Sequence, residues 1–300
     1  CLRDMSLLQN SNAVTPSAGY TIDNSLRFNG GTSNSLTRTP GSAGDRQKWT
    51  ISMWFKRGMI PWNHPRLFSA YEGTDDRVDC YPDGSTDQWY FELNTTSPSA
   101  SASNVRTTQV FRDPAAWMHY VWAVDTTLAT GNDRQKVYIN GSLLTAYAYT
   151  WGSPIVQNAN TAMNNTVPQW IGYSTNYATT HWDGYIAEFY IVDGQQLAAS
   201  DFGETNEDTN QWQPKKYEGT YGTNGCFLKF DNASDLGEDS SGNGNDWTVS
   251  NLTADDMVPD SPTNNWCTLN PLTHFGGGTF SEGNLEISGG NNTFSTFWPT

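Results

Sequence analysis

The stretch from Asp183 to Gly194 constrains the fold of this chain more than any other. It reads Asp-Gly-Tyr-Ile-Ala-Glu-Phe-Tyr-Ile-Val-Asp-Gly, so a branched and aromatic run is bounded by glycine at both ends. Such a run favours a β-strand, because these side chains pack well on a pleated surface. It closes a series of short strands, and we therefore expect an antiparallel two-sheet sandwich.

The strand at Trp49–Lys56 shows the clearest alternation. Ile51, Met53 and Phe55 fall on one side of it and Trp54 on the other, which predicts a central strand. Shorter candidates end at Gly, Pro, Asn or Asp, at residues 25–30, 66–70, 89–93, 105–111, 117–125, 136–140 and 169–173.

One hairpin is predicted from its turn residues. Val137–Leu144 contains Asn140-Gly141, a dipeptide that favours the positive φ angles of a two-residue turn. Before residue 195 no apolar period of 3.6 is sustained, so helix should be limited to short turns at 113–117 and 198–202. With 27 Gly and 14 Pro and only 16% charged residues, the chain reads as all-β.

The charge balance restricts the partners. Asp and Glu outnumber Lys and Arg by 31 to 16, for a formal net charge of −15. This charge opposes binding to nucleic acid phosphates or to an anionic membrane. No apolar run is long enough to span a bilayer, so we expect neither nucleic acid binding nor membrane insertion. The four cysteines, at positions 1, 80, 226 and 267, form no CxxC pair and are expected to be free thiols.

Changes in composition divide the chain into four parts. Residues 1–21 form an N-terminal arm, 22–202 a jelly-roll domain, and 203–221 an acidic strap or linker. Residues 222–300 are predicted to form a second β-rich unit that is truncated at its C-terminal end.

Five motifs, in their order along the chain, resemble the laminin-G-like, concanavalin A-like jelly-roll module. They are Leu26-Arg27-Phe28-Asn29-Gly30, Trp49-Thr50-Ile51-Ser52-Met53-Trp54, Trp117-Met118-His119-Tyr120-Val121, Val137-Tyr138-Ile139-Asn140-Gly141 and the strand from Asp183. The resemblance covers about residues 22–202 and implies two stacked antiparallel sheets.

Other segments resemble virion structural proteins of tailed bacteriophages: 6–13, 107–114, 201–221, 239–246 and 260–271. This likeness implies a tail-fibre or capsid-fibre protein on the particle surface. Its partners would then be other virion proteins, copies of itself in a homo-oligomer, and host cell-surface glycans.

We expect no enzymatic activity. Glycan hydrolysis on such a sandwich needs two neighbouring carboxylates, and Glu92 stands alone in its strand. Asp183 and Glu188 are an odd number of positions apart, so a regular strand would place them on opposite faces. His119 is expected to serve packing or hydrogen bonding. The alternative left open is a secreted carbohydrate-active enzyme or its carbohydrate-binding module, which would place the chain outside the cell.

Two kinds of ligand site are considered. Aromatic residues near loops could stack on sugar rings, and the candidates are Trp62, Trp151, Tyr173, Tyr177 and Trp182. No cofactor is required by the sequence, although calcium could use the oxygen ligands of Asp75, Asp76, Asp79, Asp239, Asn243, Asn245 and Asp246. Asp and Asn are also residues that turns prefer, and this role is favoured over calcium.

Overall fold

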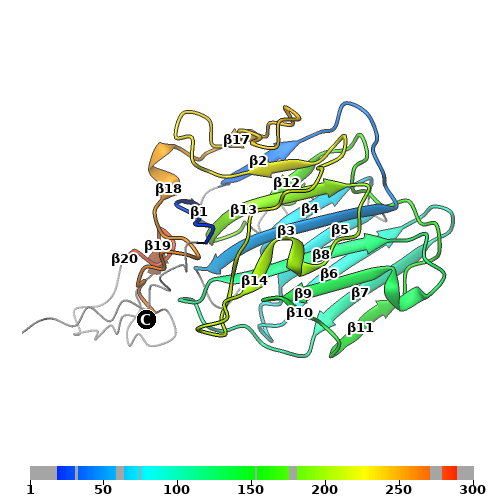
Figure 1. Cartoon of the computed structure of the whole chain (residues 1–300), viewed down its shortest axis with the longest axis horizontal. Coiled ribbons are helices and arrows are strands. Elements are labelled where there is room, and N and C mark those ends of the chain that lie inside the picture. Colours follow the sequence, from blue (N-terminus) through cyan, green and yellow to red (C-terminus); the bar gives the residue numbers. More distant parts are fainter. Residues whose placement is uncertain are drawn as a thin grey trace, which may run out of the picture.

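Two antiparallel sheets stacked face to face form the body of the protein (Figure 1). The computed structural model describes residues 19–30, 33–58, 64–73, 76–152, 154–175, 181–270 and 279–288. Sheet A has the strand order β10 (Ser142–Leu143), β9 (Gln135–Ile139), β8 (Met118–Asp125), β3 (Lys48–Arg57), β13 (Gly184–Asp193), β1 (Ser25–Phe28) and β18 (Met257–Val258), with β16 (Cys226–Leu228) also paired to β13. Sheet B has the order β11 (Tyr147–Gly152), β7 (Ser101–Thr107), β6 (Trp89–Thr95), β5 (Arg77–Pro82), β4 (Phe68–Tyr71), β12 (Gln169–Ile171), β2 (Ser35–Arg38) and β17 (Thr248–Ser250). The predicted all-β, jelly-roll type of sandwich is confirmed.

Small elements lie outside the two sheets. They are the ladders β14 (Gly203–Thr205) with β15 (Trp212–Pro214) and β19 (Thr279–Ser281) with β20 (Glu286–Ser288), and the 3-10 turns η1 (Gly131–Asp133), η3 (Ala199–Asp201) and η4 (Ala254–Asp256). The turn η3 falls where a short helix was expected, whereas residues 113–117 contain bends and no helical turn.

The space between the sheets is filled by alternate residues of the strands. In β3, Ile51, Met53 and Phe55 belong to the main core, while Trp54 lies in a separate cluster on the outer face of sheet A. The two faces of β3 therefore carry the residues that were predicted for them. The strand is also central, because β8 pairs with one side of it and β13 with the other.

The predicted hairpin is present between β9 and β10. Asn140 and Gly141 both have positive φ angles, 46° and 80°, as a two-residue turn of this type requires. Ile139 pairs with Ser142 directly beside the turn.

Strand β13 is not regular. Its register against β3 shifts between Ala187 and Tyr190, and Glu188 in between has a left-handed φ of 48°. This is a β-bulge, in which one extra residue bends the strand and changes the facing of the residues beyond it. As a result Ile186 and Phe189, three positions apart, both lie in the main core.

The acidic strap covers the outer face of sheet A. In Figure 1, β14 lies in front of that sheet. Phe202 and Tyr217 pack against Tyr190 of β13 and Val121 of β8 in one apolar cluster, with Trp212 beside it. Residues 203–221 were predicted to form a strap or a linker, and they lie along the surface of the same domain.

The prediction of a separate β unit from residue 222 onward is wrong as far as Val258. Strand β16 pairs with β13, β17 pairs with β2, and β18 pairs with β1, so all three extend the two sheets of the sandwich. Each has only two or three residues and cannot bury a core of its own. The free edges of β1 and β2 and the second half of β13 complete their hydrogen bonds instead.

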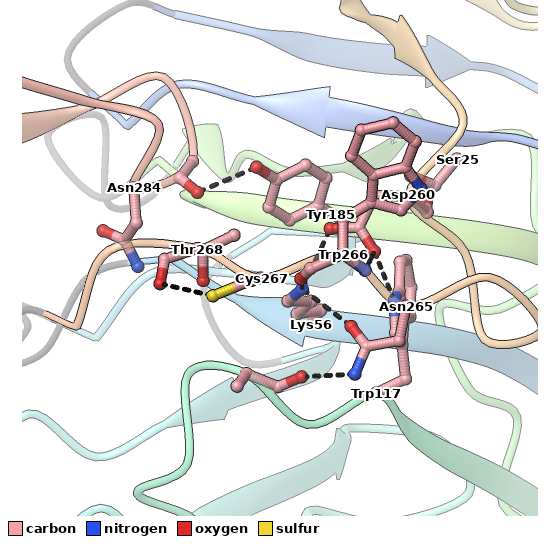
Figure 2. Close-up of polar contacts among 12 residues, drawn as sticks. Ser25, Lys56, Trp117, Tyr185, Asp260, Asn265, Trp266, Cys267, Thr268 and Asn284 are labelled. Carbon is pink, nitrogen blue, oxygen red and sulfur yellow. Dashed lines mark hydrogen bonds and ion pairs between the residues drawn. The ribbon is translucent and has the colours of Figure 1, made fainter. Parts of the chain in front are cut away.

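A buried ion pair fastens the C-terminal segment to the sandwich. Figure 2 shows Asp260, which accepts a hydrogen bond from Lys56 Nζ at 2.9 Å and another from Trp117 Nε1 at 2.9 Å. Lys56 Nζ also donates to Asn265 Oδ1 and to the carbonyl oxygen of Trp266. The side chain of Lys56 has no exposed area, so all its donors are directed to protein atoms.

Candidate functional site

Two carboxylates face each other on the outer side of sheet B. In β5, Val78 and Cys80 lie in the core, so Asp79 between them points outward. Glu92 has the same orientation in β6, and the register pairs it directly with Asp79. Residues opposite each other on antiparallel strands have Cβ atoms about 4.5–5.5 Å apart. Glu92 is the single carboxylate of its own strand, as expected, but the neighbouring strand supplies a second one.

Glu92 is held by two donors. Tyr81 donates its hydroxyl to Oε1 at 2.8 Å, and Arg77 Nε donates to Oε2 at 3.0 Å. With its amide oriented to suit the surrounding donors, Asn94 accepts from Arg77 and donates to Asn104 at 2.7 Å. This chain of contacts fixes the carboxylate in one orientation across three strands.

Asp79 is held differently. Its side chain is fully buried; Tyr71 donates its hydroxyl to Oδ2, and Arg66 Nε lies 3.7 Å from the same oxygen. Burial raises the pKa of Asp79 to about 6, although Arg66 acts in the opposite direction. Its Oδ1 has no hydrogen-bond partner among the residues that the structure describes. A buried acceptor of this kind suits a proton or a water molecule.

Stacked rings and guanidinium groups flank the two acids. The rings of Tyr81 and Tyr90 lie 5.1 Å apart at an interplanar angle of 3°, and Arg66 covers the Tyr81 ring at 3.7 Å. Arg106 Nη1 donates to the Tyr90 hydroxyl at 3.4 Å. We call this surface the sheet B face. Its residues are Arg77, Asp79, Tyr81, Tyr90, Glu92 and Arg106.

The sheet B face has a buried floor and a more accessible rim. Asp79 and Glu92 are buried, whereas Arg77, Tyr90 and Arg106 are half-buried. Aromatic faces can pack on the C–H surface of a sugar ring, and charged planar groups can bind its hydroxyls. A pair of neighbouring carboxyl groups is also the arrangement that glycoside hydrolysis needs.

Several predicted aromatic candidates cannot be placed at this face. Trp62 and Tyr177 lie outside the described residues. The backbone of Trp151 is paired with Asn104, at the end of the row that contains Asp79 and Glu92. Tyr173 is half-buried and stacks on His181 with ring centroids 5.1 Å apart.

Trp182 is a core residue, and its selection as a glycan-stacking candidate is wrong. Its side chain has no exposed area, and its ring lies 6.1 Å from both Phe55 and Trp89. The residue lies two positions before β13 and enters the space between the sheets, so neither face of its ring is open to a ligand.

Each described residue among the calcium candidates hydrogen-bonds to other protein groups. Asp239 accepts from the backbone N–H groups of Phe227, Ser241 and Asn245 and from the Ser241 hydroxyl, so two donors reach each of its oxygens. Asp239 therefore stabilises a turn, which is the role favoured over calcium binding. Asn243 and Asn245 donate to the carbonyl oxygen of Gly225.

The other calcium candidates are dispersed. Asp76 accepts from the backbone and the hydroxyl of Thr96, Asp79 belongs to the sheet B face, and Asp75 lies outside the described residues. Asp246 accepts from the Asp239 N–H. Within the described part of the chain, no group of three or more His, Cys, Asp or Glu residues is placed to hold a metal ion.

His119 and Ser52 form a close pair on the outer face of sheet A that does not activate a nucleophile. Trp212 Nε1, which can only donate, lies 3.0 Å from His119 Nδ1. The neutral ring therefore carries its proton on Nε2 and donates it to Ser52 Oγ at 2.8 Å. Burial lowers the pKa of His119 to about 3. The expected role in packing and hydrogen bonding is confirmed.

Asp183 and Glu188 are also separated by their partners. The Asp183 carboxylate accepts from the Gly30 N–H at 3.2 Å, whereas Glu188 accepts from the hydroxyls of Tyr20 and Tyr190. Burial raises the pKa of Asp183 to about 6 and that of Glu188 to about 7. The bulge removes the regular alternation on which the opposite-face argument relied, but the two acids still do not share a site.

Sequence reasoning missed half of the sheet B face because it did not predict β5. The segment Arg77-Val78-Asp79-Cys80-Tyr81 alternates polar or aromatic residues with apolar ones, which is the signal of a strand with one exposed side. Asp79 was instead grouped with the loop aspartates as a calcium ligand. Recognising that alternation would have placed Asp79 and Tyr81 on one face.

Comparison with known proteins identifies the family. The model of the concanavalin A-like lectin/glucanases superfamily, laminin G subgroup 3, matches residues 29–200, more than half of the chain. The chain belongs to this superfamily. A search of curated proteins gave no match. No helix in the described residues is long and apolar enough to cross a membrane.

Solved structures of similar fold share little sequence with this domain. A heptameric pentraxin from Limulus polyphemus is 15% identical with a TM-score of 0.41, covering 59% of this chain and 78% of its own. Domains LG4-5 of the mouse laminin α1 chain are 12% identical with a TM-score of 0.39, covering 61% and 44%. The CBM40 of a Ruminococcus gnavus sialidase, bound to α2,3 sialyllactose, is 16% identical with a TM-score of 0.36, covering 54% and 85%. At these values the likenesses add nothing to the family assignment.

Proposed function

We propose that this domain binds carbohydrate through the sheet B face without hydrolysing it, as an adhesion and structural module on the outside of a phage particle. The observation that carries the binding proposal is the row of Asp79 and Glu92 flanked by the stacked Tyr81 and Tyr90. It combines an aromatic surface with directed charged groups on adjacent strands, which suits a sugar ring and its hydroxyls.

The rim should make the first contacts with a glycan. Arg106 Nε is buried and has no hydrogen-bond partner among the described residues, while the guanidinium is otherwise engaged only by Tyr90. Arg77 already orients Glu92 from the other side of the row. A ligand hydroxyl between them would replace water at charged, fixed groups, where hydrogen bonds are strongest.

Glycan-array binding by the full chain, followed by calorimetry on the best ligand, tests this proposal. Arg106→Ala and Glu92→Gln should each weaken binding about tenfold or more, because a hydrogen bond to a charged group contributes about 1.5–3 kcal/mol. The matched controls are Arg112→Ala and Glu204→Gln, two exposed positions outside the face. Equal affinity of all four variants would overturn the assignment of the site.

Hydrolysis is the second candidate, since Asp79 and Glu92 are neighbours and burial raises the pKa of Asp79 well above the usual range of a carboxyl group. Against it stands the complete burial of Asp79, which keeps its carboxyl group from a glycosidic oxygen. An assay for new reducing ends on every glycan that binds distinguishes the two. Turnover that disappears in both Asp79→Asn and Glu92→Gln would make the protein a glycosidase.

The position on a phage particle rests on the resemblance of the segments at 6–13, 107–114, 201–221, 239–246 and 260–271 to virion structural proteins. A net charge of −15 is compatible with an outer surface that does not bind nucleic acid. Antibodies raised against the chain should label intact particles in electron micrographs. Labelling of secreted material alone would favour the carbohydrate-active alternative.

A further inference from the structure

A long part of the chain carries no charge at all. From Val137 to Thr180 the sequence contains no Asp, Glu, Lys, Arg or His, over 44 residues. At the 16% charged content of the whole chain, about seven charged residues would be expected in that length. Core burial accounts for the later part of this span, because Ile155, Ala159, Ala162, Met163 and Ile171 lie in the main core. At a surface, charged residues are depleted where a partner makes contact.

The earlier part of this uncharged segment, up to Gly152, forms the open side of the sandwich. It contains β10 and β11, which are the edge strands of sheets A and B at the same end of the molecule (Figure 1). Among the residues that the structure describes, no strand pairs with the outer side of β11. Soluble proteins commonly protect such an edge with Lys, Pro or a very short strand. Strand β10 has two residues, but β11 has six and includes neither Lys nor Pro.

In the part of the chain that the structure describes, the gap between the two edges contains a cavity. A cavity of about 260 Å³ opens between β7 and the hairpin of β9 and β10. Core residues Val105 and Val137 line it together with Leu143, whose side chain is 45% exposed. Exposed apolar surface beside an unprotected edge strand marks a site of protein contact.

The backbone of β11 shows which groups are available. The carbonyl oxygen of Ala146 accepts from the Thr108 N–H, so residues 146 and 148 bond toward β7. By the alternation of a strand, the N–H and C=O groups of Tyr147 and Tyr149 point away from the sheet. The register shift between Tyr149 and Trp151 then ends this regular part of the edge.

We propose that β11 pairs antiparallel with β11 of a second copy of this chain, across a two-fold axis at Ala148. Tyr147 of each copy would exchange both backbone hydrogen bonds with Tyr149 of the other, and sheet B would continue through the pair. A second copy of an acidic chain can meet this edge because Tyr147–Gly152 carries no charge, so the pairing sets no like charges against each other. An isologous contact needs a self-complementary patch, and an uncharged antiparallel edge meets that condition.

Three measurements on the full chain test this pairing. Sedimentation equilibrium should give about twice the 33.3 kDa mass of one chain. Tyr149→Pro should return the mass to one chain, because it removes an outward N–H that β7 does not use. Hydrogen exchange should show slow amides at Tyr147 and Tyr149 in the wild type, and fast exchange at Tyr147 in the variant.

A cross-link tests the register. Residues on a two-fold axis in a non-hydrogen-bonded pair have Cα atoms about 4.5 Å apart, within the range of a disulfide. Ala148→Cys, in a background with Cys1→Ser and Cys267→Ser, should therefore form covalent dimers under mild oxidation. Thr248→Cys in the same background, on the opposite edge strand β17, is the control and should not.

Several results would contradict the proposed pairing of β11 with β11. A wild-type mass of one chain, or fast exchange at Tyr147 and Tyr149 in a larger assembly, overturns the pairing, as does a Tyr149→Pro variant that keeps the larger mass. If Tyr149→Pro fails to fold, the cross-link decides, and its absence overturns the register. Glycan binding at the sheet B face can fail independently of all these measurements.

Discussion

Lys56 Nζ and Asp260 Oδ2 lie 2.9 Å apart in a place where Lys56 has no solvent contact (Figure 2). The pair joins the middle of sheet A to a residue more than 200 positions later in the chain. Further hydrogen bonds hold both charged groups in place. Removal of one group therefore leaves the other charge buried without a counter-ion.

Removal of one member of this pair should be strongly destabilising. We expect Lys56→Met to lower the free energy of unfolding by about 3–5 kcal/mol, because it leaves the Asp260 carboxylate buried without a counter-ion. Urea unfolding followed by tryptophan fluorescence measures the change. Lys229→Met breaks the exposed pair with Asp231 and is the control, with an expected loss below about 1 kcal/mol. Similar losses in both variants would contradict this account.

The stability of the domain should fall as the pH rises from about 4.5 to 8. Burial raises the pKa of Glu188 to about 7, above its value in the unfolded chain. The folded state then binds the proton more tightly, so the stabilisation is complete at low pH and is lost as pH passes through the folded pKa. The contribution of this one group is about 3 kcal/mol.

Glu188→Gln tests this dependence. The variant should lose the part of the pH dependence that lies near pH 7, as measured by urea unfolding at several pH values, while Glu204→Gln on the exposed β14 should keep it. Asp79 and Asp183, with pKa values raised to about 6, should still destabilise the folded state as the pH rises between 4 and 6. An unchanged profile in Glu188→Gln would refute the assignment.

His119 should hold one tautomer across the neutral range. Because Trp212 donates to Nδ1 at 3.0 Å and burial lowers the pKa of His119 to about 3, the ring should remain neutral with its proton on Nε2 from pH 5 to 8. Nitrogen-15 chemical shifts of the imidazole report this directly. Trp212→Phe removes the donor and should shift the Nδ1 resonance. A ring that titrates near pH 6.5 would show that the strap does not cover it.

Gly141 should be far less tolerant of substitution than another glycine with a similar backbone angle. Gly73 has a φ of 88° and open space around it, so Gly73→Ala should cost only the backbone strain of about 1 kcal/mol. A Cβ at Gly141 would lie 2.4 Å from the Trp212 ring, so Gly141→Ala should cost about 2–4 kcal/mol. Thermal unfolding of both variants measures the difference, and equal losses would mean that the strap moves aside freely.

Local patterns predicted the elements whose residues interact with near neighbours. The alternation of Ile51, Met53 and Phe55 was sufficient to orient β3, since its period matches the pleat of a strand. The Asn140-Gly141 turn was predictable for the same reason, because its φ angles depend on two adjacent residues. Strand β5 carries a similar alternation, which would have sufficed to predict it.

Other features depend on which strands become neighbours. Asp79 and Glu92 are 13 positions apart, and only the pairing of β5 with β6 brings them together. The β-bulge at Glu188 changed the facing of the second half of β13, and no periodic rule marks where an extra residue will be accommodated. Residues 226–258 joined the existing sheets because three short strands cannot form a core alone.

By itself the sequence determined the all-β class, the central strand, the main hairpin and the absence of charge over Val137–Thr180. Composition and period-two patterns are properties of contiguous residues and can be read without the fold. Only the tertiary structure decided that Asp79 faces Glu92, that Trp182 is buried, and that β11 is the edge strand of sheet B among the described residues. These outcomes depend on strand order and register, which are set by long-range packing between segments that no local pattern connects.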